Sequence, residues 1–307
     1  MTGGDTLSGK VVVVTGGGRG VGRAVALLAA SEGGRVVVND LGADPAGQGA
    51  EPGVANEVID VIKQAGGEAV ASGDSISDQK GAERIIQTAL DSYGRIDAVI
   101  NCAGILRDRM FHNMTQAEWS DVIKVHLDGA FNISKAAAPF FKAENSGAYV
   151  HYTSTSALMG NIGQTNYMAA KMGVVGLSRG IALDMAKFKV RSNCIAPFAW
   201  SRLVGNVPVT TPERARQMEL SRERMTAEKI APLAVFLASD AAAEVSGQIF
   251  AARANEVYLV SQPRVIRSVH RSEGWTPKTV AETVLPSLRS AFYPLQPMME
   301  LFNWDPI

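Results

Sequence analysis

Three side chains in one stretch of the chain, Ser154, Tyr167 and Lys171, have the types and spacing of an acid–base site. Tyr167 and Lys171 are four residues apart, so on a helix they would share one face. A phenol titrates at about pH 10, but a neighbouring ammonium group lowers this pKa because it stabilises the anion. Ser154 could then hold a carbonyl or alcohol oxygen by a hydrogen bond. The set would suit moving a hydroxyl proton while a hydride moves elsewhere, although this Tyr–Lys spacing alone is also typical of an ordinary amphipathic helix.

Residues 10–33 have the pattern of a strand, a glycine-rich turn and a helix. Val11 to Val14 form an unbroken β-branched run, as expected of a parallel strand buried on both faces. The glycines that follow would let the backbone approach a pyrophosphate at the N-terminus of the next helix. A glycine-rich turn is a weak signal by itself, but its position between a strand and a helix is the context that supports a dinucleotide site.

A second strand ends in Asn39-Asp40, about 20 residues beyond the glycines. Asp40 is placed to accept hydrogen bonds from both ribose hydroxyls of an adenosine, although it could also be a simple turn residue. Its carboxylate would repel a 2′-phosphate, which favours NAD over NADP. Arg19, in the glycine turn, could instead pair with that phosphate. We expect Asp40 to decide the preference because its charge would lie closest to the 2′ oxygen.

With these motifs together, the chain resembles the short-chain dehydrogenase/reductase family over most of its length. The family's TGxxxGxG motif appears as residues 15–22, its NNAG segment as residues 101–104, and its Ser, Tyr and Lys as Ser154, Tyr167 and Lys171. The resemblance implies that Tyr167 is the general acid/base, that Lys171 lowers its pKa and holds the nicotinamide ribose, and that Ser154 orients the substrate oxygen. A hydride would then pass between the carbinol carbon and the nicotinamide of NAD.

The resemblance also implies which residues bind the cofactor. Asp74 and Ser75 follow the third strand, where the family contacts adenine; Asp74 could accept from the adenine amine, cap the next helix, or do both. The full expected set comprises Thr15, Gly16, Gly18, Arg19, Gly20, Val21, Gly22, Asp40, Asp74, Ser75, Asn101, Ala103, Gly104, Tyr167, Lys171, Pro197, Ala199 and Ser201.

Two positions depart from the family pattern. His126 stands where many members place an Asn that serves a proton relay, partly through its main-chain carbonyl. The imidazole could carry protons itself, or it could be a packed helix residue. Pro197-Phe198 replaces the usual Pro-Gly before the loop that covers the nicotinamide, so the contacts of that loop are open.

These departures, with the segments VVVNDLGAD and GNIGQTNY, are most similar to one branch of the family. That branch comprises the (3R)-hydroxyacyl-CoA dehydrogenase units of peroxisomal multifunctional enzymes of type 2, also called 17β-hydroxysteroid dehydrogenases of type 4. The likeness implies oxidation of a (3R)-hydroxyacyl-CoA to the 3-ketoacyl-CoA in fatty-acid or sterol side-chain β-oxidation. The alternatives are oxidation of a free 17β-hydroxysteroid, reduction of a 3-ketoacyl-carrier protein, and a non-catalytic NAD-binding sensor.

The order of predicted elements indicates an α/β fold with a single doubly wound parallel sheet, helices on both faces and a C-terminal extension. Strands are predicted at residues 10–15, 35–39, 68–73, 97–101, 147–153, 190–196 and 247–251. Helices are predicted at residues 20–32, 53–65, 78–93, 115–142, 165–187 and 227–239.

We expect one dehydrogenase domain over residues 1–252, with a substrate lid near 202–225. Residues 253–307 would form an extension packed on the core or on a neighbouring subunit. Its Arg267 and Arg271 could meet coenzyme A phosphates. Residues 41–53, rich in Gly and Pro, are predicted to be a loop inserted without a function of its own.

Composition narrows the class of protein further. Lys plus Arg equals Asp plus Glu, 30 each, so no net field attracts nucleic acid or an anionic membrane. No apolar stretch approaches the length of a membrane span, and the first residues lack the pattern of a signal peptide. The two cysteines are not in a metal-ligand spacing, and no metal is expected. These features favour a cytoplasmic protein. The resemblance implies a homodimer or homotetramer that binds a small-molecule substrate, an acyl-CoA or a steroid.

Overall fold

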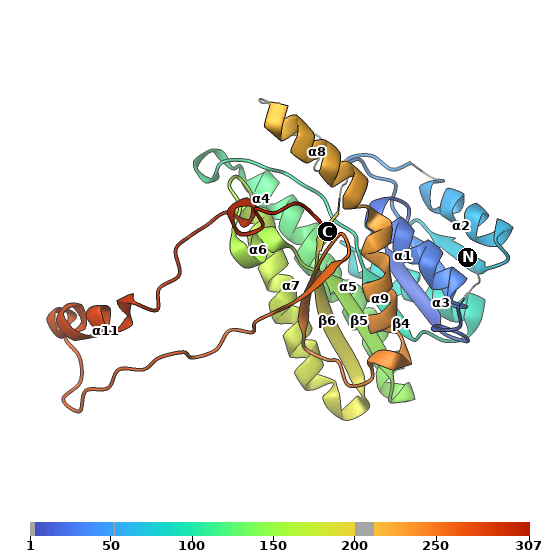
Figure 1. Ribbon diagram of the computed structural model, residues 1–307. Coiled ribbons are helices and arrows are strands. Elements are labelled where there is room, and N and C mark those ends of the chain that lie inside the picture. Colours follow the sequence, from blue (N-terminus) through green and yellow to red (C-terminus); the bar gives the residue numbers. More distant parts are fainter. Residues whose placement is uncertain (1–3, 52, 200–211) are drawn as a thin grey trace.

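The central strands are rich in Val, Ile and Ala because helices cover both faces of the sheet they form. The computed structural model describes residues 4–51, 53–199 and 212–307. Its eight strands lie in the order β3-β2-β1-β4-β5-β6-β7-β8 (Figure 1). The strands are β1 (Val11–Thr15), β2 (Arg35–Asn39), β3 (Glu68–Ser72), β4 (Ala98–Asn101), β5 (Gly147–Tyr152), β6 (Val190–Phe198), β7 (Ile249–Arg253) and β8 (Glu256–Val260). Strands β1 to β7 pair in parallel, which confirms the predicted fold class.

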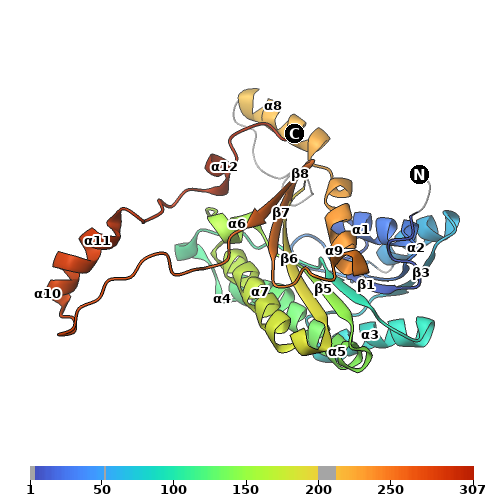
Figure 2. The same ribbon diagram turned by 60° about the horizontal axis from the view of Figure 1, so that its bottom comes forward.

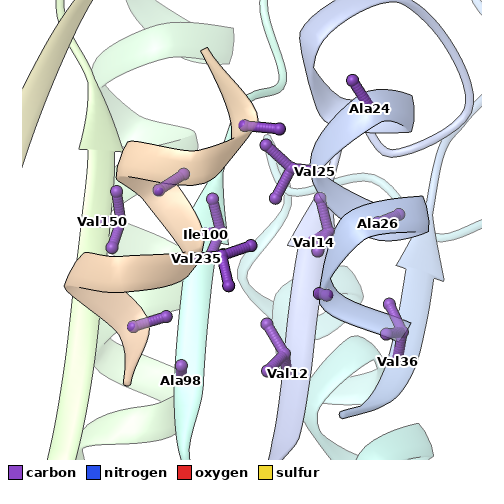
Figure 3. Packing of buried hydrophobic residues seen from close by; sticks show 14 of the residues in the cluster. Val12, Val14, Ala24, Val25, Ala26, Val36, Ala98, Ile100, Val150 and Val235 are labelled. Carbon is purple, nitrogen blue, oxygen red and sulfur yellow. The ribbon is translucent and has the colours of Figure 1, made fainter. Parts of the chain in front are cut away.

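Two groups of helices bury the two faces of the sheet. On one face, α1 (Gly20–Ser31), α2 (Val54–Gln64) and α9 (Ala231–Ala238) pack against side chains such as Val12 and Ile100 (Figure 3). On the other face lie α3 (Gln79–Tyr93), α5 (Gly129–Glu144) and α7 (Thr165–Asp184). Within the described ranges, no helix is both long enough and apolar enough to span a bilayer.

The remaining helices are short or lie at the carboxyl edge of the sheet and in the tail. The long helix predicted over residues 115–142 is divided by a π-helical turn, Lys124–Asp128, into α4 (Gln116–Ile123) and α5. The others are α6 (Thr155–Met159), α8 (Pro212–Arg224), α10 (Pro277–Thr279), a second π-helical turn (Val280–Val284), α11 (Leu285–Arg289) and α12 (Met298–Leu301).

Strand β8 was not predicted, and it pairs with β7 in the antiparallel direction. Its residues alternate between half-buried and exposed, and Val257 and Leu259 are both exposed. This alternation is typical of an edge strand with one covered face. The sheet therefore continues beyond residue 252 and is not parallel throughout.

The tail leaves the body after β8, turns through α10 and α11, and returns to the sheet at α12 (Figures 1 and 2). Residues 261–296 of this tail form an arm that is highly solvent-exposed: Val265 is 90% and Leu295 100% exposed. The last residues pack on the core, where the Asn255 amide donates to the Ile307 carbonyl and Phe302 meets Phe198.

Candidate active site

The structure brings Ser154, Tyr167 and Lys171 together at the carboxyl end of β5. Ser154 begins α6, and its hydroxyl accepts from the Ser156 amide at 3.1 Å. Tyr167 and Lys171 lie on α7, with the Lys171 Nζ 5.8 Å from the centre of the Tyr167 ring. The Lys171 ammonium donates to the Tyr152 carbonyl at 2.7 Å. The helical spacing predicted from the sequence therefore places both titratable groups beside Ser154.

Burial dominates the electrostatics of this set. It raises the pKa of Tyr167, which a hydrogen bond with Ser154 lowers and the nearby charge of Asp108 raises further. Burial also lowers the pKa of Lys171 to about 8. In this geometry the Tyr167 phenol is a protonated acid at neutral pH.

His126 lies in the π-helical turn between α4 and α5, directly against Tyr167. The two rings meet edge to face with centroids 5.2 Å apart. The His126 Nε2 lies 2.8 Å from the Ile105 carbonyl and 3.1 Å from the Ile105 amide, while Nδ1 is buried without a partner among the described residues. Burial, with the Lys171 charge, lowers the His126 pKa well below its ordinary value. A neutral imidazole results, fixed to the backbone of the loop after β4.

Gly104 explains how that loop comes so close. A Cβ at residue 104 would lie 2.3 Å from the His126 Cε1, so only glycine fits against the ring. The motif residue and the unusual histidine are therefore a packed pair.

Asn166 is a site residue that the sequence reasoning missed. It is fully buried, and its amide donates to the Arg107 carbonyl at 3.0 Å and the Glu118 carbonyl at 2.9 Å. Its Oδ1 accepts from the Tyr167 amide at 2.8 Å. These bonds join the start of α7 to α4 and to the loop after β4, and so fix the backbone of Tyr167.

The sequence reasoning also missed Gln164 and Asp108, which form a hydrogen-bonded pair beside Tyr167. Gln164 donates to the Asp108 carboxylate at 2.8 Å and accepts from Asn161 at 2.9 Å. Burial raises the pKa of Asp108, and the Gln164 hydrogen bond opposes that rise. The only signal in the sequence was the concentration of polar residues in NIGQTNY.

The glycine turn between β1 and α1 forms a cradle that fits a dinucleotide. A Cβ at Gly22 would lie 2.0 Å from the Gly16 carbonyl, and one at Gly16 would lie 2.7 Å from the Ala103 Cα. Gly16 and Gly20 adopt positive φ angles of 63° and 52°. Helix α1 has no side-chain cap at its N-terminus, so its first amides are available to a pyrophosphate.

The turn joins the loop after β4 at the point where the strand order reverses. Thr15 donates to Asn101 at 2.6 Å, and the Ala103 amide lies 3.4 Å from the Thr15 hydroxyl. A crevice at such a reversal is where open α/β sheets bind their ligands. Val21, also predicted to contact the cofactor, packs against the hydrophobic core.

Asp40 stands at the end of β2, as predicted. One carboxylate oxygen accepts from the Gly18 amide at 2.9 Å and the other from the Gly42 amide at 2.8 Å. Each oxygen keeps further lone pairs that can accept from ribose hydroxyls.

Asp74 and Ser75 follow β3, but Asp74 does not cap the next helix. Its carboxylate pairs with Arg84 at 2.6 Å, whereas Asp78 caps α3 through the Gly81 amide at 2.8 Å. The Ser75 hydroxyl accepts from the Ser77 amide at 3.2 Å. The capping alternative for Asp74 was therefore wrong.

The far side of the site is formed by the end of β6 and by the returning tail. Pro197 pairs with Ala252 in the sheet, and Ala199 packs against the core. Thr155, next to Ser154, donates to the Met298 sulfur at 3.0 Å. Ser201, and residues 202–211 of the expected lid, lie outside the described residues; the rest of that segment contains α8.

Arg267 and Arg271 belong to the arm, residues 261–296, which extends away from the sheet (Figure 1). Arg267 donates to Ser287 and Ser290, and Arg271 pairs with Glu273. Both guanidinium groups thus contact residues of the arm itself.

Comparison with known proteins agrees with this geometry. Residues 10–201 match the family model described as short chain dehydrogenase. The chain belongs to this family. It is therefore an oxidoreductase that acts on alcohols or the corresponding carbonyls.

Two relatives indicate which branch of the family the chain resembles. The chain is 38% identical over 276 residues to the peroxisomal multifunctional enzyme type 2 of Mus musculus, covering 89% of this chain but 36% of the relative. It is 37% identical over 292 residues to hydroxyacyl-CoA dehydrogenase ChsB1 of Mycobacterium tuberculosis, covering 91% and 88%. The chain thus spans about a third of the multifunctional relative and most of the second protein. The predicted resemblance to the multifunctional enzymes is confirmed.

A solved structure extends the similarity to the whole fold. The crystal structure of a short chain dehydrogenase from Mycobacterium avium superposes with a TM-score of 0.82 at 35% identity, covering 95% of this chain and 98% of that one.

Proposed function

We propose that the protein oxidises a (3R)-hydroxyacyl-CoA to the 3-ketoacyl-CoA with NAD, in β-oxidation of fatty acids or sterol side chains. The convergence of Ser154, Tyr167 and Lys171 at the crevice beside the glycine turn carries the proposal. The names of the multifunctional and hydroxyacyl-CoA relatives support the substrate class. Asp40 supports NAD, because a carboxylate at the ribose disfavours a 2′-phosphate.

The proton chemistry belongs to the side chains. Ser154 would hold the substrate oxygen, and Tyr167 would take the hydroxyl proton during oxidation or return it during reduction. Burial raises the pKa of Tyr167, so Tyr167 can take the proton only as a phenolate, which the positive charge of Lys171 would have to stabilise when the site is occupied. Bound NAD, held at the glycine turn and Asp40, would supply the hydride acceptor. Neutral His126 would hold the loop at Ile105 in place rather than carry a proton as an imidazolium.

The test is initial-rate reduction of NAD, and then of NADP, followed by nicotinamide absorbance. The purified protein would be offered the (3R)- and (3S)-3-hydroxyacyl-CoA and a 17β-hydroxysteroid. We expect rapid NAD reduction only with the (3R)-thioester. A preference for the free steroid, or no reaction with any thioester, would contradict the proposal.

The proposed assembly is a homodimer or homotetramer. Exposed apolar side chains on α5 and β8, including Phe131 and Leu259, support it because burying them would favour association. Light scattering coupled to size-exclusion chromatography would measure the mass; a monomer at micromolar concentration would contradict this proposal.

A further inference from the structure

The segment 41–51, in the loop between β2 and α2, reaches both walls of the cofactor crevice. Asp44 organises its centre, because one carboxylate oxygen accepts from the Ala46 amide at 2.9 Å and from the Gln48 amide at 2.8 Å. Toward the loop after β4, the Pro45 carbonyl accepts from the Leu106 amide at 3.1 Å. The Gly- and Pro-rich composition that predicted an insertion without a function does not reveal these contacts.

At its other end the loop reaches the glycine turn through Glu51. The Glu51 amide donates to the Gly42 carbonyl at 3.1 Å, and a Cβ at Gly42 would collide with the Glu51 backbone. The Glu51 carboxylate forms an ion pair with the Arg19 guanidinium. Arg19 directly follows Gly18, whose amide holds Asp40. One connected network of hydrogen bonds and an ion pair therefore lies beside the position of the adenosine ribose. It is formed by Asp40, Gly42, Glu51 and Arg19.

We propose that Glu51 helps to determine which dinucleotide the protein accepts, because it holds the Arg19 guanidinium and withholds it from a phosphate on the ribose 2′ oxygen. The proposal rests on the dinucleotide cofactor of the proposed function, but not on the identity of the alcohol. Asp40 excludes that phosphate by its own negative charge. Glu51 would act by a different route, by occupying the cation that could neutralise the phosphate.

The expected effect is modest because the pair is accessible to water. The Arg19 side chain is 31% and the Glu51 side chain 68% exposed. Exposed ion pairs of this kind change an equilibrium by less than about tenfold. Removing the Glu51 charge, with Asp40 retained, should therefore strengthen NADPH binding by about twofold to fivefold. NADH, which has no 2′-phosphate, should be affected less than about twofold.

The experiment is fluorescence titration of the full chain with NADPH and with NADH, at one low ionic strength and without an alcohol substrate. Glu51→Gln is compared with Glu57→Gln, a matched control in the first turn of α2. We expect only Glu51→Gln to lower the Kd for NADPH. The double variant Arg19→Ala/Glu51→Gln should lose that gain, because the released cation is no longer present.

Equal NADPH affinities in Glu51→Gln and Glu57→Gln would overturn the proposal. A gain that persists in the double variant would overturn it too, because the gain could not then come from Arg19. Either result leaves the proposed oxidation intact, since no alcohol is present in the titration. Wild-type protein that binds neither dinucleotide would refute the proposed function together with this inference.

Discussion

Replacement of Asn166 by Ala should destabilise the protein and displace Tyr167, its proposed general acid/base, at the same time. Asn166 is fully buried and makes three hydrogen bonds, to the Arg107 carbonyl, the Glu118 carbonyl and the Tyr167 amide. Alanine would leave all three backbone groups without their partner. A net hydrogen bond contributes about 1 kcal/mol, and an unsatisfied buried group costs about 1–3 kcal/mol. We therefore expect the free energy of unfolding to fall by about 3–5 kcal/mol.

The matched control is Asn132→Ala. Asn132, on α5, is half-buried and donates one hydrogen bond, to the Ile76 carbonyl at 3.0 Å. Its loss should cost only about 1 kcal/mol. Urea unfolding followed by circular dichroism would measure both variants under the same conditions.

Activity provides a second measurement. Because the Asn166 bond fixes the Tyr167 amide, folded Asn166→Ala protein should oxidise its substrate at least about tenfold more slowly, whereas Asn132→Ala should match the wild type. If the two variants differed by less than about 1 kcal/mol in unfolding free energy, the assignment of Asn166 as the anchor of the α7 N-terminus would be wrong.

Three further changes probe other parts of the site and the core. Tyr167→Phe should abolish turnover while NADH binding stays nearly intact; substantial residual activity would remove the acid–base role. Gly18→Ala should weaken NADH binding by at least about tenfold in a fluorescence titration, because its Cβ would lie 2.4 Å from Val54 and 2.9 Å from the Asp40 carboxylate. Unchanged affinity would show that the glycine turn does not bind the dinucleotide. Burial lowers the pKa of His151 to about 4, so the unfolded chain takes up the proton first as the pH falls. Between about pH 6.5 and about pH 4, this histidine should reduce the unfolding free energy by about 1.4 kcal/mol per pH unit. In His151→Phe, the unfolding free energy measured with urea should depend less on pH in this range. Equal slopes in the variant and the wild type would show that His151 is not the source of the pH dependence.

The sequence predicted the parts of the fold that rest on short-range patterns. The β-branched run of β1, the glycines after it and Asp40 at the end of β2 all lie where they were expected. The spacing of Tyr167 and Lys171 fixed their common face for the same reason. These features depend on local backbone geometry, which a sequence pattern records directly.

Features that depend on distant partners were not predictable in the same way. The bonds of Asn166 reach carbonyls of residues 107 and 118, and nothing in the sequence around residue 166 identifies those acceptors. The π-helical turn at His126 was hidden because helical periodicity runs through it without interruption. Strand β8 was hidden because EVYLV does not alternate between polar and apolar residues, and its direction depends on the tight connection from Arg253 to Glu256.

The arm formed by residues 261–296 has both ends fixed, by β8 at one end and by α12 and the last residues at the other. Its exposed middle therefore behaves as a closed loop whose length contributes little to stability. Loop-closure entropy rises only with the logarithm of length, so doubling the arm would cost about 0.6 kcal/mol. A peptide epitope or a fluorescent label inserted at its tip near Gly274, where φ is 77°, should leave the sheet and the crevice undisturbed. The arm is thus a natural attachment point for reporters on a working enzyme.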